Sequence, residues 1–450
     1  MNNALRVQIG TALVLLLLAL LIGLLAALSY SFPALGALVS FKHLRPAHVS
    51  AALFWIITGA TVGVVHYRGE VWRSSTPSPY HKAFVLLWIV AVVAILFAYA
   101  GGRFGGREYW EFPPVIGLLI LAAWVLLLVD HLRAWVRRTP EPPLYVWMWT
   151  TGVFFFLLTF IEQNLWQIDW FRQTYVREIT VQWRSNGAMV GAWNQMIYGT
   201  ALYLMTRISG DDALARGPKV FLFWFLGLAN LMFNWGHHIY NVPTAAWIRH
   251  VAYGISMLEW IFFINIIRGF KAKLGEYGRH KKGITYRFLV SAELWVFLNL
   301  FLALLMSIPA VNRYTHGTHI TVAHAMGTTI GINTMILLGS FTYMLGMDRE
   351  ERGKRWLGVG LRIALFGLGA FWLALLIAGA IKGWRTTALG ITDHQRVMRP
   401  VNAVLEYFVA SGAVLALGLG IVAVVLLNRL LGSWRRHQAC LHQEDQANWK

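Results

Sequence analysis

Two adjacent histidines, His237 and His238, close a long apolar stretch and are the residues whose types point most directly to chemistry. They lie in Phe-Asn-Trp-Gly-His-His-Ile-Tyr-Asn-Val-Pro, residues 233–243, where an apolar segment would meet water at a membrane surface. Such side chains are costly there unless they are used, and neutral imidazole is the commonest protein ligand for iron, copper and zinc. The pair predicts a metal site; the competing interpretation is interfacial histidines satisfied by water or neighbouring helices.

The composition is that of a polytopic membrane protein. Of 450 residues, 57% are hydrophobic and only 13% are charged, and apolar stretches of spanning length recur throughout. No cleavable signal is evident, so the first apolar run predicts a spanning helix. The net charge of +19 comes from Lys and Arg in short loops, which indicates membrane orientation rather than nucleic-acid binding.

The chain predicts an all-α fold of about twelve transmembrane helices in one domain, residues 1–432, followed by a polar cytoplasmic tail, residues 433–450. The predicted spans are 10–31, 46–66, 83–101, 113–132, 145–165, 185–206, 218–240, 245–267, 288–308, 315–345, 357–382 and 399–428. Tryptophans at span ends, Trp183 among them, fit an aromatic belt. The single cysteine, Cys440, lies in the tail, and no Cys-x-x-Cys-His haem motif is present, so electrons must enter from outside the chain.

Lys and Arg concentrate in loops that share one side if both termini are cytoplasmic. They include Arg133, Arg137, Arg138, Lys271, Lys273, Arg279, Lys281, Lys282, Arg349, Arg352, Lys354 and Arg355. The positive-inside rule therefore favours cytoplasmic termini. In that orientation His48 begins span two, Asn186 lies in the first turn of span six and the histidine pair ends span seven. His324 falls about 15 Å into span ten at the helical rise. These nitrogen-bearing side chains share the outer half of the bilayer, which favours metal or haem binding.

His324 and Met326 lie two residues apart on one predicted helix, so their side chains point about 200° apart. A histidine and a methionine on opposite faces could serve two cofactors. His324 would bind one haem iron, and Met326 another, with His48 across from Met326. The competing interpretation of Met326 is a plain packing residue.

The sequence resembles the haem–copper oxidase superfamily, and specifically the large subunit of bacterial nitric oxide reductases. The matching segments are Leu44–His48, Gly236–Tyr240, Leu258-Glu259 and Thr315–His324. The resemblance implies that His48 binds a low-spin haem b and His324 is the proximal ligand of a high-spin haem b. His237 and His238 would ligate a non-haem iron, or copper in its place. Glu259 would complete or border that metal site, tuning it or passing protons.

The departures from this family fall on ligands. The resemblance places Asn186 where family members have a third metal-binding histidine, and Val190 and Asn194 where they have two glutamates. An asparagine carbonyl oxygen is a harder and weaker ligand than imidazole for a divalent transition metal. Met326 stands where the family has the histidine opposite His48, and thioether ligation raises a haem potential relative to two imidazoles.

The resemblance implies an integral protein of the bacterial inner membrane, with its metal site toward the periplasm, that reduces two nitric oxide molecules to nitrous oxide and water. The external electron donor would be a cytochrome c-type or cupredoxin subunit, or a quinol. Three alternatives stay open. They are a nitric oxide dismutase-like enzyme, signalled by Asn186; a dioxygen-reducing oxidase, with Tyr240 as its candidate tyrosine; and a non-catalytic haem protein that binds a diatomic gas.

A few polar residues around the predicted site carry two interpretations each. Arg313, His316 and His319 would lie near haem propionates or serve as interfacial anchors. Glu293 and Glu406 are predicted as buried carboxylates that belong to a proton path or pair with a neighbouring helix.

Overall fold

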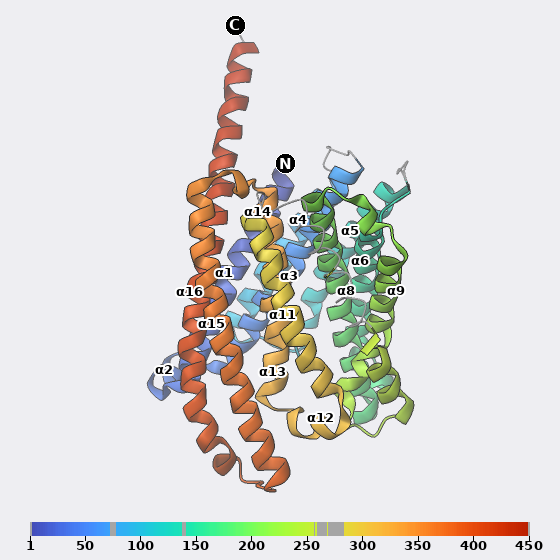
Figure 1. The fold of residues 1–450 in the computed structure, drawn as a ribbon, viewed down its shortest axis with the longest axis vertical. Helices are drawn as coiled ribbons and strands as arrows, with labels where there is room; N and C mark the ends of the chain where they lie inside the picture. Colours follow the sequence, from blue (N-terminus) through green and yellow to red (C-terminus); the bar gives the residue numbers. More distant parts are fainter. Residues whose placement is uncertain are drawn as a thin grey trace.

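Long helices lie side by side in the computed structural model of the chain (Figure 1). The structure describes residues 2–448 apart from 73–77, 137–140, 256, 259–267 and 269–282. All of its regular elements within those residues are helices. The predicted all-α fold is therefore confirmed.

The first half of the chain forms the helices that lead to the histidine pair. They are α1 (Asn3–Ser31), α2 (Pro33–Leu38), α3 (Phe41–Val71), α4 (Pro79–Ala100), α5 (Pro114–Val136), α6 (Leu144–Gln163), η1 (Leu165–Gln167), α7 (Asp169–Arg172), α8 (Tyr175–Ser209), η2 (Asp212–Ala215), α9 (Pro218–Phe233) and η3 (Asn234–Ile239).

The second half contains the segment with His324 and two long closing helices. Its elements are α11 (Ile284–Ser307), α12 (Pro309–Thr315), α13 (His319–Met326), η4 (Gly327–Thr334), α14 (Met335–Met344), η5 (Met347–Arg349), α15 (Glu351–Gly383), η6 (Trp384–Ala388) and α16 (His394–Asn448). Residues 246–255 are also helical and fall at the start of the predicted eighth span.

Nine helical segments in the described part of the chain are long and apolar enough to cross a membrane. α8 is long enough, with 35 residues, but it is more polar, and α9 has only 16 residues. α8 also begins ten residues before the predicted sixth span. Its start is set by Thr174, whose side chain accepts a hydrogen bond from the Arg177 amide, and its end by Gly210 at φ 71°.

The predicted seventh span, 218–240, is too long. α9 ends at Phe233, and residues 234–239 continue as the 3₁₀ turn η3. Asn234 bridges the two elements, because its backbone N–H closes the last turn of α9 on Asn230. The histidine pair therefore sits on a tight turn rather than on a regular α-helix.

The predicted tenth span is a compound element. It runs through α13, the π-helix η4 and α14. Two glycines let η4 touch α11, since a Cβ at Gly327 would lie 2.3 Å from Asn299 Oδ1 and one at Gly331 would lie 2.4 Å from Trp295 Cγ. Single π-turns are rare and occur often at functional sites, which directs attention to the residues just before η4.

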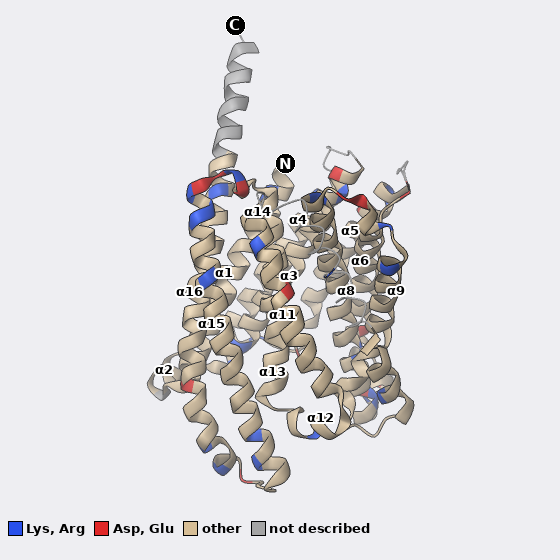
Figure 2. Ribbon diagram, in the orientation of Figure 1, with Lys and Arg blue, Asp and Glu red and all other residues tan. Residues whose placement is uncertain are grey.

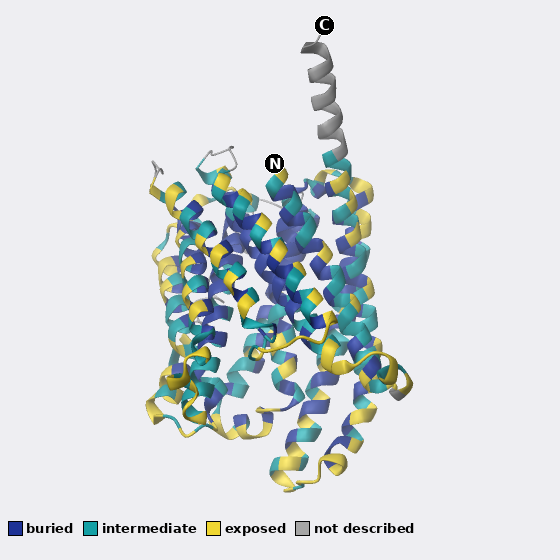
Figure 3. Cartoon of the chain, turned by 180° about the vertical axis from the view of Figure 1, so that it is seen from behind, coloured by how far each residue is buried: buried dark blue, intermediate teal, exposed yellow. Residues whose placement is uncertain are grey.

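The start of α1 and the C-terminal part of α16 lie at the same end of the helix bundle. The Arg6 guanidinium at the start of α1 donates to the Ser433 carbonyl of α16 at 3.2 Å. Lys and Arg bands gather at this end on α15 and α16 (Figure 2), and the bundle interior is buried while its outward faces are not (Figure 3). The start of α1 and this part of α16 therefore meet at the same end of the bundle.

Candidate metal and haem centre

The histidine pair is held by neighbours on two sides. The rings of His237 and His238 lie 4.2 Å apart between centroids. Nδ1 of His237 donates to Asn234 Oδ1 at 3.0 Å, and the ring of His238 stacks on Trp183 of α8 at 4.9 Å and 10°. Because Nδ1 of His237 carries the donated proton, its Nε2 lone pair is free to bind a metal.

α8 approaches this turn closely through two glycines. A Cβ at Gly187 would lie 2.7 Å from Trp235 Cβ, and one at Gly191 would lie 2.8 Å from Leu231 Cβ. Asn186 is therefore brought beside η3, on the same face of α8 as Trp183 three residues earlier. Its side chain is 6% exposed, and neither its amide oxygen nor its amide nitrogen has a hydrogen-bond partner within the described residues.

His324 faces the pair from α13. The rings of His324 and His316 lie close enough to His237 and His238 to interact with them electrostatically. Nδ1 of His324 is buried without a hydrogen bond of ordinary geometry, although the Asn299 backbone of α11 interacts with the ring. The structure thus brings together side chains that are 78 or more residues apart in the chain.

His48 is fixed against α1. Its Nδ1 donates to the Ala19 carbonyl at 2.8 Å, and its ring occupies the space beside Gly23, where a Cβ would lie 2.5 Å from two ring atoms. The hydrogen bond selects the tautomer with a free Nε2 lone pair. A backbone carbonyl on one nitrogen and a free lone pair on the other is the usual arrangement of a metal-binding histidine.

These four histidines are neither fully buried nor exposed. His48, His237, His238 and His324 are each intermediate in exposure. The free Nε2 lone pairs of His48 and His237 and the unpaired Asn186 amide are donor atoms that fit haem and metal binding.

Met326 lies on the other side of α13 from His324. It packs against the apolar cluster formed by Leu302, Ile320, Ala323 and Leu375. That environment is one in which a methionine fills space. Its role as a haem ligand stays a prediction.

The predicted residues nearest the site surround the turn from α12 to α13. Arg313 and His316 are exposed there, and His319 is half-buried. Partial desolvation by the surrounding protein lowers the pKa of His316 from its ordinary value. Nδ1 of His319 is buried without a hydrogen bond to the described residues.

Other predicted residues are engaged elsewhere. The Tyr240 hydroxyl donates to the Ser307 carbonyl of α11 at 3.3 Å. Val190 packs against the main apolar core, and Asn194 Oδ1 accepts from Asn333 of η4 at 3.0 Å. Glu259 lies outside the described residues.

The two predicted buried carboxylates differ from each other. Glu293 is 8% exposed and has an interaction partner, which agrees with burial. Glu406 is exposed on the outer face of α16, so its prediction as a buried carboxylate is wrong. The apolar run of span twelve indicated insertion, but it could not show which face of the helix turns outward.

Among the described residues, no group of three or more His, Cys, Asp or Glu side chains lies close enough to hold a metal ion. The constellation is instead two imidazoles with an amide, facing a third imidazole. Sequence reasoning missed Trp183, which it assigned to the aromatic belt, and the π-helix η4. Gly327 and Gly331 are the sequence feature that could have pointed to η4, because glycines four residues apart on one helix face let a neighbouring helix approach closely.

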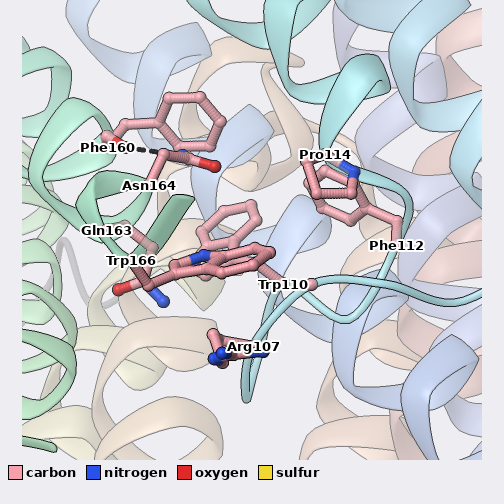
Figure 4. Close-up of a pocket in the computed structure, with 9 residues that line it drawn as sticks. Arg107, Trp110, Phe112, Pro114, Phe160, Gln163, Asn164 and Trp166 are labelled. Atoms are coloured by element: carbon pink, nitrogen blue, oxygen red, sulfur yellow. Dashed lines mark hydrogen bonds between the residues drawn. The ribbon is translucent and has the colours of Figure 1, made fainter. Parts of the chain in front are cut away.

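A small pocket lies elsewhere, between the loop before α5 and the end of α6 (Figure 4). Its lining includes Trp110, Phe160, Gln163 and Trp166. Arg107 stacks over Trp166 at 4.1 Å and donates to Glu178 of α8 at 2.7 Å. No predicted site residue lines this pocket, so it is distinct from the histidine constellation.

Comparison with known proteins places these features in context. The family model described as cytochrome c and quinol oxidase polypeptide I matches residues 3–415. Cytochrome c oxidase subunit 1 of Rhodobacter capsulatus is 23% identical over 393 residues, covering 81% of this chain and 73% of the relative. A nitric oxide reductase subunit of Stutzerimonas stutzeri is 21% identical over 407 residues, covering 83% of this chain and 82% of the relative.

A solved structure shares the fold. The cryo-EM structure of a heme-copper terminal oxidase dimer superimposes with a TM-score of 0.75 at 16% identity, covering 96% of this chain and 85% of the other. The relatives thus include both cytochrome c oxidase subunits and a nitric oxide reductase subunit. The superfamily-level resemblance is confirmed, and the similarity does not single out the nitric oxide reductases.

Proposed function

Because the chain belongs to the family of cytochrome c and quinol oxidase polypeptide I, the haem–copper oxidases, we propose that it is a membrane oxidoreductase acting on nitric oxide. The proposed reaction joins two nitric oxide molecules, takes up two electrons and two protons, and releases nitrous oxide and water. The observation that carries the proposal is the His237–His238 pair, whose rings lie 4.2 Å apart between centroids, beside the buried Asn186 amide that has no hydrogen-bond partner within the described residues.

The donor set indicates which residues would hold each group. His324 would hold a high-spin haem b, and His48, with Met326 as second ligand, a low-spin haem b. His237, His238 and Asn186 would hold a non-haem iron, or copper in its place. When bound, these groups supply electron transfer and attachment points for two diatomic molecules.

The protein itself orients the side chains that would bind the metal. Asn234 and Trp183 orient the two imidazoles from opposite sides, so their nitrogen lone pairs are directed before anything binds. Holding two small reactants side by side would convert a bimolecular encounter into an effectively unimolecular step. Glu259 is the proposed residue that tunes the metal or passes protons.

Dismutation of nitric oxide is the second candidate. Two nitric oxide molecules would rearrange into dinitrogen and dioxygen with no net electrons. Asn186 favours this interpretation, because its uncharged oxygen in place of an imidazole changes the donor set of the metal site.

Two further alternatives have less support from the geometry. Dioxygen reduction is the activity of an oxidase, the class named in the cytochrome c oxidase relatives, but the candidate Tyr240 directs its hydroxyl to the Ser307 carbonyl. A non-catalytic haem protein would need only one haem site, whereas both His48 and the His324 constellation carry free imidazole nitrogens.

We propose the inner membrane of a bacterium as the location, with both termini cytoplasmic and the metal site toward the periplasm. Residues 1–432 would form the membrane domain and 433–450 a cytoplasmic tail. The external electron donor would be a cytochrome c-type or cupredoxin subunit, or a quinol.

The test combines composition with product analysis on the purified full-length protein. We expect two haems b and one additional metal per chain, and anoxic nitric oxide should yield nitrous oxide only when a reductant is present. Dinitrogen and dioxygen without a reductant would select dismutation. One haem with no second metal would leave only a gas-binding role.

A further inference from the structure

We propose that Glu162 and Gln163, the last two residues of α6, are positioning residues for the metal site, because they fix the rotation of α8 that directs Asn186. The inference rests on the proposed function, in which Asn186 ligates the second metal. It adds two side chains that act on this ligand through the backbone of α8.

Nothing at the Asn186 side chain itself fixes its direction. Neither its amide oxygen nor its amide nitrogen has a hydrogen-bond partner in the part of the chain that the structure describes. Metal–ligand distances must be met to within about 0.2 Å. The side chain therefore depends on the helix that carries it, both for its distance from the histidine pair and for the side of α8 on which it lies.

α6 holds α8 at the two residues that directly precede Asn186. Arg184 forms an ion pair with Glu162, and the two side chains are 28% and 22% exposed. Ser185 Oγ donates a hydrogen bond to Gln163 Oε1 at 2.6 Å, and both of these residues are buried. A single contact would let the helix turn about it, whereas two adjacent contacts define the rotation.

The Gln163 amide connects α8 to the small pocket of Figure 4. Its Oε1 accepts from Ser185, whereas its Nε2 has no partner among the described residues, and the side chain lines the pocket. Arg107, which also lines the pocket, donates to Glu178 of α8 at 2.7 Å. The edge of the pocket therefore supplies a further attachment of α8, about two turns before Asn186.

The contacts with α6 lie on the opposite side of α8 from the metal site. Successive residues of an α-helix are about 100° apart. Taking Trp183 as zero, Asn186 lies at about 300° and Gly187 at about 40°, so all three share the side that faces η3. Arg184 at about 100° and Ser185 at about 200° lie on the other side. α8 is therefore held between α6 and η3.

A small rotation of α8 would be enough to displace the ligand. Side-chain ends lie about 5–6 Å from a helix axis, so a turn of about 20° moves them by about 2 Å. That displacement is roughly ten times the tolerance of a metal–ligand distance. Loss of either contact with α6 should therefore weaken metal binding, although no ligand is removed.

The experiment measures Co²⁺ binding to the full-length, haem-loaded protein after a chelator has removed the second metal. Ser185→Ala and Gln163→Leu should each lower the affinity for Co²⁺ about tenfold, as changes outside the ligand set commonly do. With the haems reduced, the EPR spectrum of the bound Co²⁺ should also change, because the donor geometry around it is altered. A general loss of stability would not change that spectrum.

The matched control is Thr200→Val on the same pair of helices. Thr200 lies about four turns beyond Asn186, and its Oγ1 accepts from Nε1 of the buried Trp149 of α6 at 3.2 Å. The variant loses one buried hydrogen bond between α6 and α8, as Ser185→Ala does, and should lower the thermal midpoint comparably. Its Co²⁺ affinity and EPR spectrum should stay those of the unmodified protein.

Exchange of the ion pair covers the case in which a single change impairs folding. Glu162→Arg and Arg184→Glu should each weaken Co²⁺ binding. The double variant E162R/R184E should recover most of the affinity, because the pair is restored in reverse. No recovery in a folded double variant would show that charge pairing does not hold α8 and would contradict the proposal.

The remaining outcomes separate the positioning role from the metal site itself. Unchanged affinity and spectrum in Ser185→Ala and Gln163→Leu would overturn the positioning role and leave the metal site standing. An equal loss of Co²⁺ in Thr200→Val would do the same, because it would mean a general loosening of the two helices. Failure of the unmodified protein to bind Co²⁺ would overturn both.

Discussion

At the scale of single residues, the candidate centre is marked by polar atoms that the protein leaves unsatisfied. The Asn186 amide holds two buried atoms, its oxygen and its nitrogen, without hydrogen bonds to the described residues, and each such atom costs roughly 1–3 kcal/mol. A bound group that these atoms ligate would offset that cost. Asn194, in contrast, is satisfied by Asn333, so the two asparagines of α8 have different roles.

Replacing Asn186 by alanine should lower the second-metal content after dialysis against a chelator, and Asn186→His should raise it, because imidazole binds divalent transition metals more strongly. Elemental analysis per haem is the measurement. Asn194→Ala is the control and should retain the metal. Equal metal content in all three proteins would remove Asn186 from the ligand set.

Met326→His should lower the midpoint potential of the low-spin haem, because imidazole stabilises ferric haem more than a thioether does. Spectroelectrochemical titration measures it. Met326→Leu keeps the apolar packing and should abolish the low-spin spectrum if the sulfur ligates. An unchanged spectrum and potential in both variants would assign Met326 to packing alone.

At the scale of helices, small residues set how closely the site's supports approach. Gly187 and Gly191 bring α8 against η3 and α9, and Gly23 admits the His48 ring beside α1. At each of these glycines the backbone touches a side chain of the neighbouring element, and there is no room for an added Cβ atom. The positions of Asn186 and the histidine pair therefore depend on residues that bear no functional group.

Gly187→Ala should destabilise the protein by about 1–3 kcal/mol and loosen the metal, because its Cβ would overlap Trp235. Thermal unfolding and metal content report both effects. Gly369→Ala on α15 is the matched control, since open space surrounds that position. A fully stable Gly187→Ala protein with normal metal content would show that the two elements can separate without consequence.

At the scale of the whole molecule, polar contacts inside the bundle join helices distant in sequence. Arg68 of α3 pairs with Asp130 of α5 at 2.6 Å, and Gln8 of α1 bridges Thr61 and His81. Hydropathy predicted the helices, and the common level of His48, Asn186, His237 and His324 in the membrane stays a prediction. Hydropathy could not predict the 3₁₀ turn, the π-helix or the outward face of Glu406, because those depend on backbone register and on neighbours rather than on residue type.

Asp130→Asn should destabilise the protein by about 3–5 kcal/mol, because Arg68 would stay buried without its counter-charge. The double variant R68M/D130L, which removes both charges, should recover most of the loss. Thermal unfolding in detergent compares the two. A double variant as unstable as Asp130→Asn would show that packing volume, rather than an uncompensated charge, accounts for the loss.

The π-helix η4 between α13 and α14 determines how the protein would respond to the loss of a residue in this segment. Deleting one residue from 327–334 would let the segment rewind as ordinary α-helix and rotate everything before it by about 100° relative to α14. His324 would then swing away from the pair it faces, so a single codon lost there should be more harmful than most substitutions nearby.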